Sequence, residues 1–316
     1  MADYVPQLAT LVKAPPDGDE WLHEIKFDGY RIGARVKNGR VSLFSRNGKD
    51  WTHAFPDVVA AIDKLHLTDA LIDGEVASVL PDGRTSFQSL QNAGGIGKAG
   101  LVVYFVFDLL RLEGERLEQL PLAERKARLL KLVGRRKTGR IRYSAHVDGS
   151  GRAFFDQACR MGLEGIISKR RDLPYKAGRH GGWVKTKCIL RQEFVIGGFT
   201  EPEGSRVGLG ALLIGHYEDG KLIFAGKVGT GFTRNSSIAL RKQLERLAQP
   251  DCPFVPKLKG ALVRTATWVK PTLVGEVAFT EWTSDGKIRH PSFQALRADK
   301  RATEVVRERP AAVPTR

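Results

Sequence analysis

One lysine lies among charged residues that could make it a nucleophile. Lys26 has Glu24 two residues before it, Asp28 two residues after it and Arg31 five residues after it. A lysine amine with its ordinary pKa of about 10.4 is protonated and cannot attack. Neighbouring cations or burial lower the pKa of such an amine, and Asp28 could position it and accept its proton. Taken alone, however, K-x-D-G is more typical of a surface lysine before a turn.

The elements that would position this lysine are mixed helices and strands. Residues 31–36 and 40–45 are predicted to form a hairpin, because Asn38-Gly39 between them supplies the positive φ angles of a tight turn. The run 101–107 is apolar on both faces and is therefore expected to be a central strand. A further strand is expected over 71–72, and helices over 121–133 and 153–161.

After about residue 190 the pattern changes to β. Strands are expected over 193–200, 211–217, 221–228 and 272–282, with one helix over 236–248 that has a Ser cap and a Pro stop. A small Greek-key barrel fits this count, and the OB-fold is a common barrel of this kind in nucleic-acid binding. We therefore predict an α+β chain with domains over 1–190 and 191–302, followed by a flexible, proline-containing tail over 303–316.

Composition and charge narrow the class of protein. The 316 residues are enough for about two domains. Lys and Arg (51) exceed Asp and Glu (35), which gives a net charge of +16 and indicates a polyanionic partner. The scattered glycines and prolines exclude collagen, and the ordinary aromatic content excludes wholesale disorder. No apolar run is long enough for a membrane span, and no signal peptide is evident. Three widely spaced cysteines predict no zinc site and reduced thiols, which are typical of a cytoplasmic protein.

Six short motifs occur in a fixed order along nearly the whole chain. They are Glu24 to Arg31, Ser45-Arg46-Asn47-Gly48, Asp73-Gly74-Glu75 with the 105–110 strand, Glu164 to Lys169, Trp183 to Lys187, and the pair Arg289 to Phe293 and Arg297 to Lys300. In type and order they resemble the motifs of the covalent nucleotidyltransferases, the superfamily of ATP-dependent DNA ligases, RNA ligases and mRNA capping enzymes. The resemblance implies a nucleotidyltransferase (adenylation) domain followed by an OB-fold domain.

The resemblance also implies a role for each motif residue. Lys26 would attack the α-phosphate of ATP and carry AMP as a phosphoramidate. Lys185 and Lys187 would hold that phosphate and help to keep the Lys26 amine neutral. The remaining pocket residues would bind the nucleotide: Arg31 and Arg46 at the ribose and phosphates, Glu24 and the backbone of Ile25 at the adenosine, Phe107 stacked on adenine, and Glu75 and Glu164 at the ribose and at Mg²⁺, which Mn²⁺ could replace.

The last motif lies in the barrel. In the family, its basic residues orient pyrophosphate when the barrel closes over the nucleotide. The resemblance gives this role to Arg289, Arg297 and Lys300, with Asp299 accompanying them. The alternative for all three is a basic terminal loop on a basic protein. A second basic stretch, the nine Lys and Arg of 125–142, is either a solvated face or a phosphate contact.

The domain inventory favours one branch of the superfamily. Few residues precede Lys26, and neither a large helical DNA-binding domain nor zinc modules are present. The barrel segments 194–200, 208–213 and 289–293 look most like the ligase module of bacterial non-homologous end-joining ligases. We therefore expect a monomer that seals nicked or broken duplex DNA, with Ku and end-joining polymerase and nuclease modules as possible partners. An RNA ligase, a GTP-dependent capping enzyme or a non-catalytic DNA-binding module remain alternatives.

Overall fold

The protein divides into two compact units. The structure is a computed structural model that describes residues 4–91, 101–135, 138–202, 204 and 207–313. Unit 1 comprises residues 1–188 together with 309–316, and unit 2 comprises residues 189–308. Each unit combines sheet and helix, which confirms the predicted α+β class. Within the described ranges, no helix is long and apolar enough to cross a membrane.

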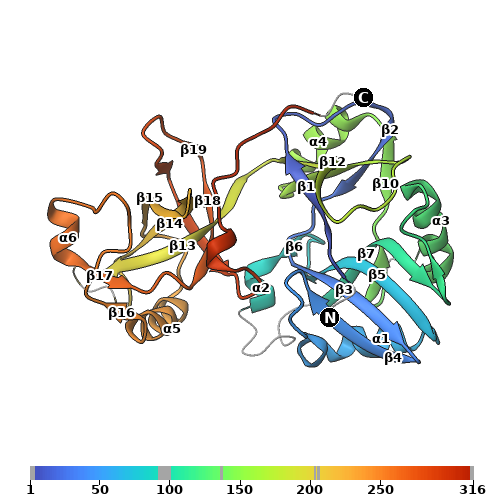
Figure 1. The fold of residues 1–316 in the computed structure, drawn as a ribbon, viewed down its shortest axis with the longest axis horizontal. Coiled ribbons are helices and arrows are strands. Elements are labelled where there is room, and N and C mark those ends of the chain that lie inside the picture. The colour runs from blue at the N-terminus through green and yellow to red at the C-terminus, as the bar shows by residue number, and fades with distance from the viewer. Residues whose placement is uncertain (1–3, 92–100, 136–137, 203, 205–206, 314–316) are drawn as a thin grey trace. The chain divides into compact units, whose positions relative to one another are not determined.

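Unit 1 is built from two sheets, which lie one above the other in Figure 1. The first has the order β1-β12-β11-β2-β10 and the second the order β4-β3-β5-β7-β8, with β6 beside β5 and β9 beside β7. The strands of the first sheet are β1 (Gln7–Leu11), β2 (Gly18–Ile25), β10 (His146–Gly149), β11 (Gly165–Arg170) and β12 (Gly178–Lys187). Those of the second are β3 (Tyr30–Lys37), β4 (Arg40–Ser45), β5 (Asp69–Val79), β6 (Thr85–Ser86), β7 (Leu101–Leu112), β8 (Glu115–Arg116) and β9 (Ile141–Tyr143).

The predicted hairpin and central strand are confirmed. Residues 30–37 pair with 40–45, and Asn38 and Gly39 both have positive φ in the turn. β7 pairs with β5 along its length and is buried from Val102 to Leu110, which explains why its sequence is apolar on both faces. The helices are α1 (Pro56–Asp63), α2 (Phe87–Gln91), α3 (Leu122–Val133) and α4 (Gly151–Arg160), so the two predicted helices are present with small shifts at their ends.

Two motif glycines are required by close backbone approach. A Cβ on Gly29 would lie 2.2 Å from the carbonyl oxygen of Val76, and one on Gly165 would lie 2.1 Å from that of Thr186. Gly165 also has a φ of +149°, which other residues rarely adopt. Its carbonyl accepts a hydrogen bond from the backbone N–H of Lys26 at 3.0 Å. These glycines therefore let the segments around Lys26 and Glu164 pack directly against their neighbouring strands.

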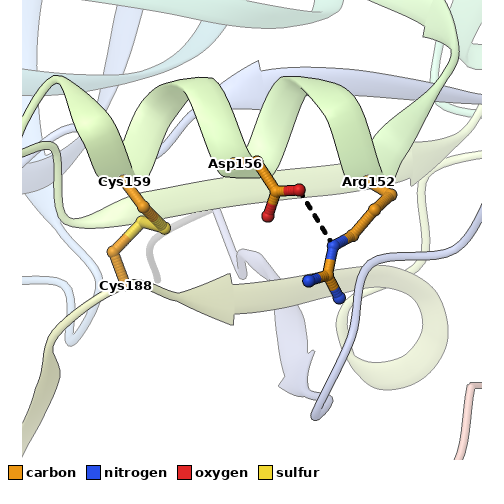
Figure 2. The surroundings of a disulfide bond; sticks show 4 residues. All are labelled: Arg152, Asp156, Cys159 and Cys188. Atoms are coloured by element: carbon orange, nitrogen blue, oxygen red, sulfur yellow. Dashed lines mark hydrogen bonds and ion pairs between the residues drawn. A yellow bond between two sulfur atoms is a disulfide. The ribbon is translucent and has the colours of Figure 1, made fainter.

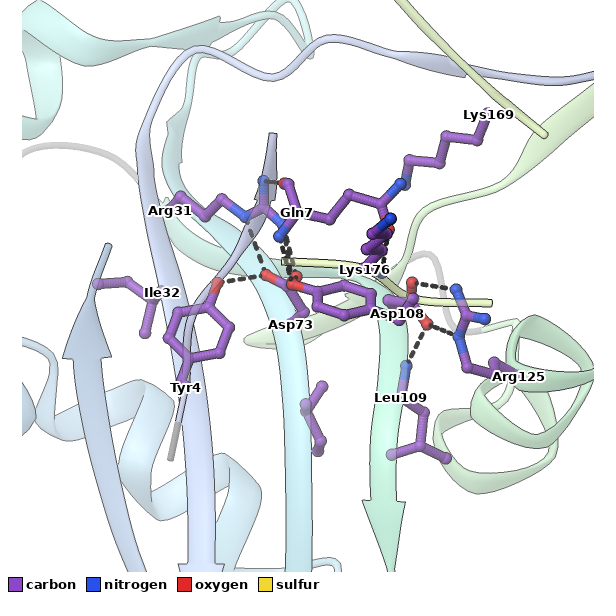
Figure 3. A network of polar contacts seen from close by, with 12 residues as sticks. Tyr4, Gln7, Arg31, Ile32, Asp73, Asp108, Leu109, Arg125, Lys169 and Lys176 are labelled. Carbon is purple, nitrogen blue, oxygen red and sulfur yellow. Dashed lines mark hydrogen bonds and ion pairs between the residues drawn. The ribbon is translucent and has the colours of Figure 1, made fainter. Parts of the chain in front are cut away.

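Helix α3 carries buried charge. Arg125 and Asp108 of β7 are both fully buried and form a bidentate pair, with Nε and Nη2 at 2.8 and 2.9 Å from the two carboxylate oxygens (Figure 3). Its neighbour Lys126 is 1% exposed. The basic stretch 125–142 therefore does not begin as a solvated face. Its first two cations join the helix to the sheets, whereas Arg128 is half-buried and Lys131 is exposed.

Unit 2 is a curled β structure that, in its described residues, also has two α-helices and a short 3-10 helix over Ala302–Glu304. β13 (Leu190–Thr200) lies at its centre and pairs with β14, β17 and β18. The other strands are β14 (Ala211–Glu218), β15 (Lys221–Val228), β16 (Ala248–Gln249), β17 (Ala266–Val269), β18 (Val274–Phe279), β19 (Glu281–Trp282), β20 (Ile288–Arg289) and β21 (Ser292–Leu296). The helices are α5 (Arg234–Glu245) and α6 (Ala261–Thr265). The cap of α5 is Thr233 rather than the predicted Ser236, which completes a capping box with it.

The C-terminal segment is more ordered than the sequence predicts. Instead of a flexible tail over 303–316, Val305 is buried in unit 2 and Val306 bridges to Tyr217. Ala311 then pairs with Val12 in unit 1, and Val313 packs against the cluster of Val12, Trp21 and Val184. The prolines suggested a frayed end, but Val305 and Val313 pack into apolar clusters and hold the segment in place. Residues 314–316 lie outside the described part.

The cysteine prediction is wrong for two of the three residues. Cys159, in the last turn of α4, forms a disulfide with Cys188, one residue beyond β12 (Figure 2). The two are 29 residues apart, and only the packing of α4 on β11, the neighbour of β12, brings their Cα atoms to 5.2 Å, within the range that a disulfide requires. Cys252 remains a free thiol. The disulfide thus links α4 to Cys188, the last residue of the 1–188 segment of unit 1.

Candidate active site

A pocket lies between the two sheets of unit 1 and collects most of the predicted residues. The first sheet contributes Lys169 of β11 and Lys185 of β12, and the second contributes Arg31 of β3, Glu75 of β5 and Phe107 of β7. Of the predicted residues, Glu24, Ile25, Lys26, Arg31, Arg46, Glu75, Phe107 and Lys185 line it. Because β11 pairs with both β2 and β12, the segments around Lys26, Glu164 and Lys185 are neighbours in one sheet.

The side chain of Lys26 is held by a carboxylate. Its Nζ lies 2.5 Å from Oε1 of Glu164, and 22% of its side-chain surface is exposed. Burial lowers the pKa of Lys26, but Glu164, Glu75 and Asp28 outweigh burial and raise it above the ordinary value. The expectation that neighbouring cations keep this amine neutral therefore does not describe the ligand-free pocket, where acids keep it protonated.

Removing the Glu164 charge should make Lys26 more reactive in the ligand-free protein. In Glu164→Gln the ion pair is lost, so the pKa of Lys26 falls and more of its amine is neutral at any pH below that pKa. We expect trace labelling of Lys26 by acetic anhydride at pH 8 to rise about tenfold or more, since one pKa unit is tenfold in neutral amine. Peptide mass spectrometry measures this against Lys64, an exposed lysine of unit 1. Unchanged labelling of Lys26 would show that Glu164 does not control its protonation.

Arg31 is fixed in place by a buried carboxylate. Its Nε and Nη2 bind the two oxygens of Asp73 at 3.0 and 2.5 Å, and its Nη1 donates to the backbone oxygen of Gln7 at 2.6 Å. Figure 3 shows Arg31 and Tyr4 beside Asp73, to which Tyr4 donates at 2.6 Å. Tyr175 also donates to Asp73, at 2.8 Å, so this carboxylate accepts from three side chains. The guanidinium therefore presents a fixed cation to the pocket.

Glu24 occupies a second buried polar network. Its Oε1 accepts from Lys126 Nζ at 2.7 Å and from Lys169 Nζ at 3.0 Å, and its Oε2 accepts from Ser144 Oγ at 2.6 Å. Burial raises the pKa of Glu24, but Lys126 and Lys169 outweigh burial and lower it to about 2. Glu24 is therefore an ionised carboxylate in the wall of the pocket at neutral pH.

Phe107 combines pocket wall and core packing. It is 8% exposed, packs edge-on against Trp183 and belongs to an apolar cluster with Tyr4 and Tyr175. Lys169 Nζ lies 4.2 Å from its ring centroid, within the range of a cation–π contact. Phe107 is therefore a core residue that also lines the pocket, and its stacking on a ligand stays a prediction.

Lys187 differs in position from Lys185. Trp183, Lys185 and Lys187 alternate along β12 and thus share one face, but only the first two are among the described residues that line the pocket. Lys187 pairs across to Gly165 at the end of the strand. Lys185 is consequently a pocket cation, whereas Lys187 lies two residues further on, at the C-terminal end of β12.

Glu75 and Glu164 could hold a magnesium ion. Glu164 lies 2.5 Å from Lys26 Nζ, and Glu75 lines the same pocket as Lys26. Within the described ranges, no group of three or more His, Cys, Asp or Glu is placed to bind a metal. Mg²⁺ normally takes one or two carboxylates and completes its shell with water and substrate phosphates. Two glutamates at a pocket that also contains Arg31, Arg46 and Lys185 therefore fit this ion.

The basic residues that the sequence predicts in the barrel belong to unit 2, where each forms an ion pair with a carboxylate. Arg297 makes a bidentate pair with Asp299 at 2.9 and 2.8 Å and lies 3.6 Å from Glu276. Lys300 Nζ lies 3.0 Å from Glu193, and the exposed Arg289 lies 3.1 Å from Glu281. The carboxylate partners, which sequence spacing did not indicate except for Asp299, fix these cations within unit 2.

Sequence reasoning missed several residues that build the site. Asp73 directly precedes Gly74-Glu75 in a recognised motif, and that position was the signal that could have found it. Tyr4, Tyr175, Lys126 and Ser144 lie outside the motifs and reach the site only through the fold. The residues that sequence reasoning missed are thus those that position other side chains of the site by hydrogen bonds.

Comparison with known proteins gives the family. Residues 1–187 match the ATP dependent DNA ligase domain, and residues 205–300 match the ATP dependent DNA ligase C terminal region. The chain is 44% identical over 98% of its length to the multifunctional non-homologous end joining protein LigD of Pseudomonas aeruginosa, of which it covers 37%. It is 37% identical over 96% of its length to the LigD protein of Mycobacterium tuberculosis, of which it covers 40%. The chain thus spans less than half the length of these relatives.

A solved structure agrees with both units. A mycobacterial DNA ligase D complexed with ATP and MES has a TM-score of 0.72 and 35% sequence identity, covering 96% of this chain and 98% of that one. This likeness confirms the predicted nucleotidyltransferase fold followed by an OB-fold. The motifs, the pocket and the match over 1–187 agree: the chain belongs to the ATP-dependent DNA ligases.

Proposed function

We propose that this chain seals breaks in duplex DNA that carry a 5′-phosphate and a 3′-hydroxyl. The observation that carries the proposal is the pocket itself, in which Lys26 lies with Arg31, Arg46 and Lys185 between two sheets. A partly exposed amine that shares its pocket with three cations suits attack on a phosphate whose negative charge those cations stabilise.

The first step would join AMP to the protein. The neutral Nζ of Lys26 attacks the α-phosphorus of ATP, the bond to pyrophosphate breaks, and one proton passes from the amine to Asp28 as the phosphoramidate forms. Lys185, Lys187, Arg31 and Arg46 bind the phosphates and ribose, while Glu24, the Ile25 backbone and Phe107 hold the adenosine. Arg289, Arg297 and Lys300 would orient the pyrophosphate.

A metal ion would assist this step. Glu75 and Glu164 would hold Mg²⁺, which supplies positive charge that neutralises the phosphates. The same two carboxylates raise the pKa of Lys26 in the ligand-free pocket. Charge compensation at Glu75 and Glu164 therefore favours release of the Lys26 proton, which links nucleotide binding to activation of the nucleophile.

The second and third steps would act on DNA. AMP passes from Lys26 to the 5′-phosphate of the break, and the 3′-hydroxyl then attacks that phosphate with release of AMP. A net charge of +16 supports backbone contacts that are nearly independent of sequence and sensitive to salt. The names of the LigD relatives support a role in end joining. We further propose that the chain acts as a monomeric ligase in the bacterial cytoplasm, with Ku and the polymerase and nuclease modules as partners.

Nucleotide and strand preference test this proposal directly. We expect the protein with Mg²⁺ and ATP to seal a nicked DNA duplex, and to seal a nicked RNA duplex at least about a hundredfold more slowly. GTP should not replace ATP. Preference for the RNA nick would assign the chain to the RNA ligases, and an adduct formed with GTP alone would assign it to the capping enzymes. DNA binding without an adduct from either nucleotide would identify a non-catalytic module.

A further inference from the structure

Helix α3 contributes Lys126, a residue outside all the motifs, which contacts the pocket residue Glu24 from behind the pocket wall. Lys126 is 1% exposed and donates to Glu24 Oε1 at 2.7 Å and to the backbone oxygen of Ser144 at 3.0 Å. Its Nζ also lies 4.7 Å from the ring centroid of Tyr143. Neither Lys126 nor Ser144 is among the described residues that line the pocket, whereas Glu24 and Lys169 are.

The donors around Glu24 leave this carboxylate little freedom. Two oxygens offer about four lone-pair sites, and Lys126, Lys169 and Ser144 take three of them. A buried carboxylate without compensating cations would become protonated or unstable. With two lysines on Oε1 and a hydroxyl on Oε2, the group stays ionised and has one orientation.

We propose that Lys126 and Ser144 are positioning residues that hold Glu24 as a fixed hydrogen-bond acceptor for the 6-amino group of adenine, and thereby determine base selectivity. This inference rests on the proposed placement of the adenosine at Glu24. An ionised acceptor favours the amino group of adenine and disfavours the carbonyl oxygen of guanine at the same position. Lys126 and Ser144 touch neither nucleotide nor reacting atoms, so their effect should appear in the choice and affinity of the base.

The test compares self-adenylation with ATP and with purine riboside triphosphate, which lacks the 6-amino group. In Lys126→Met, we expect the efficiency of self-adenylation with ATP to fall about 10- to 100-fold, which is the cost of losing a hydrogen bond to a charged acceptor. The fall should come from a higher KM for ATP, with little change in the rate at saturating ATP. The efficiency with purine riboside triphosphate should fall less than about threefold. The ratio of the efficiency with ATP to that with purine riboside triphosphate should therefore decrease strongly. A merely structural loss would lower both equally.

Two further variants keep the outcomes distinct. Lys131→Met makes the same substitution at an exposed position of the same helix and should leave the ratio unchanged. Ser144→Ala removes the donor to Oε2 without changing any charge and should lower the ratio about threefold to tenfold, so it serves if Lys126→Met folds poorly.

Each result has one meaning. A wild-type ratio in Ser144→Ala and in folded Lys126→Met would overturn the positioning role, provided that Glu24→Gln lowers the ratio. A wild-type ratio in Glu24→Gln would instead overturn the proposed placement of adenine at Glu24. Loss of ATP discrimination in all three variants, with Lys131→Met unchanged, supports the inference.

Discussion

Replacement of Lys26 by alanine should abolish formation of the protein adenylate. No other described amine has the same position at the pocket between Glu164 and Lys185, so no side chain can take over the attack. We expect transfer of label from [α-³²P]ATP to the protein to fall at least about a thousandfold, because the covalent step loses its nucleophile.

The last step of sealing should survive the same substitution. A nick that already carries AMP on its 5′-phosphate needs only attack by the 3′-hydroxyl, in which Lys26 forms no bond. Lys26→Ala should therefore retain sealing of pre-adenylated DNA, while Lys64→Ala, at an exposed position, should behave as wild type throughout. Labelling of Lys26→Ala at the wild-type rate would show that another residue is the nucleophile.

Replacement of Arg125 by methionine should strongly destabilise unit 1. Arg125 and Asp108 are both 0% exposed, and Arg125 also donates to the backbone oxygens of Leu120 and Leu173. Removing the guanidinium leaves a buried carboxylate without its partner, which costs about 3–5 kcal/mol. Urea unfolding followed by tryptophan fluorescence measures this loss, since Trp21, Trp51 and Trp183 all belong to unit 1.

Arg128 gives the matched comparison for this substitution. It lies three residues along α3 and pairs at 2.6 Å with Glu115, but 38% and 56% of the two side chains are exposed. Such a surface pair contributes about 0–1 kcal/mol, so Arg128→Met should shift the transition little. Equal losses in the two variants would contradict the structural role assigned to the buried pair.

The sequence was most informative where local chemistry determines structure. The Asn38-Gly39 turn, the apolar strand around Phe107 and the helix after Pro121 were predicted because their signals lie within a few residues. The pocket residues were predicted by a resemblance of motifs, and eight of them meet at one site. Gly29 and Gly165 show why such motifs contain glycine, since a Cβ at either position would collide with a carbonyl.

The sequence was least informative where distant segments meet. Nothing local indicates that Cys159 meets Cys188, or that Lys126 crosses from α3 to Glu24. Charge counting treated Arg125 and Lys126 as part of a basic surface, because a sequence does not show which cations have buried carboxylate partners. For the same reason, the high pKa of Lys26 was missed: Glu164 is 138 residues away in sequence and 2.5 Å away in space.

The most direct test is to locate the adenylate and follow its transfer. The protein is freed of any AMP with pyrophosphate, incubated with Mg²⁺ and ATP, and examined by intact and peptide mass spectrometry before and after addition of nicked duplex DNA. We predict one AMP per chain, on Lys26, that is lost when the nick is supplied and appears as sealed DNA and free AMP. An adenylate on another residue, or one on Lys26 that nicked DNA does not remove, would contradict a ligase mechanism centred on Lys26.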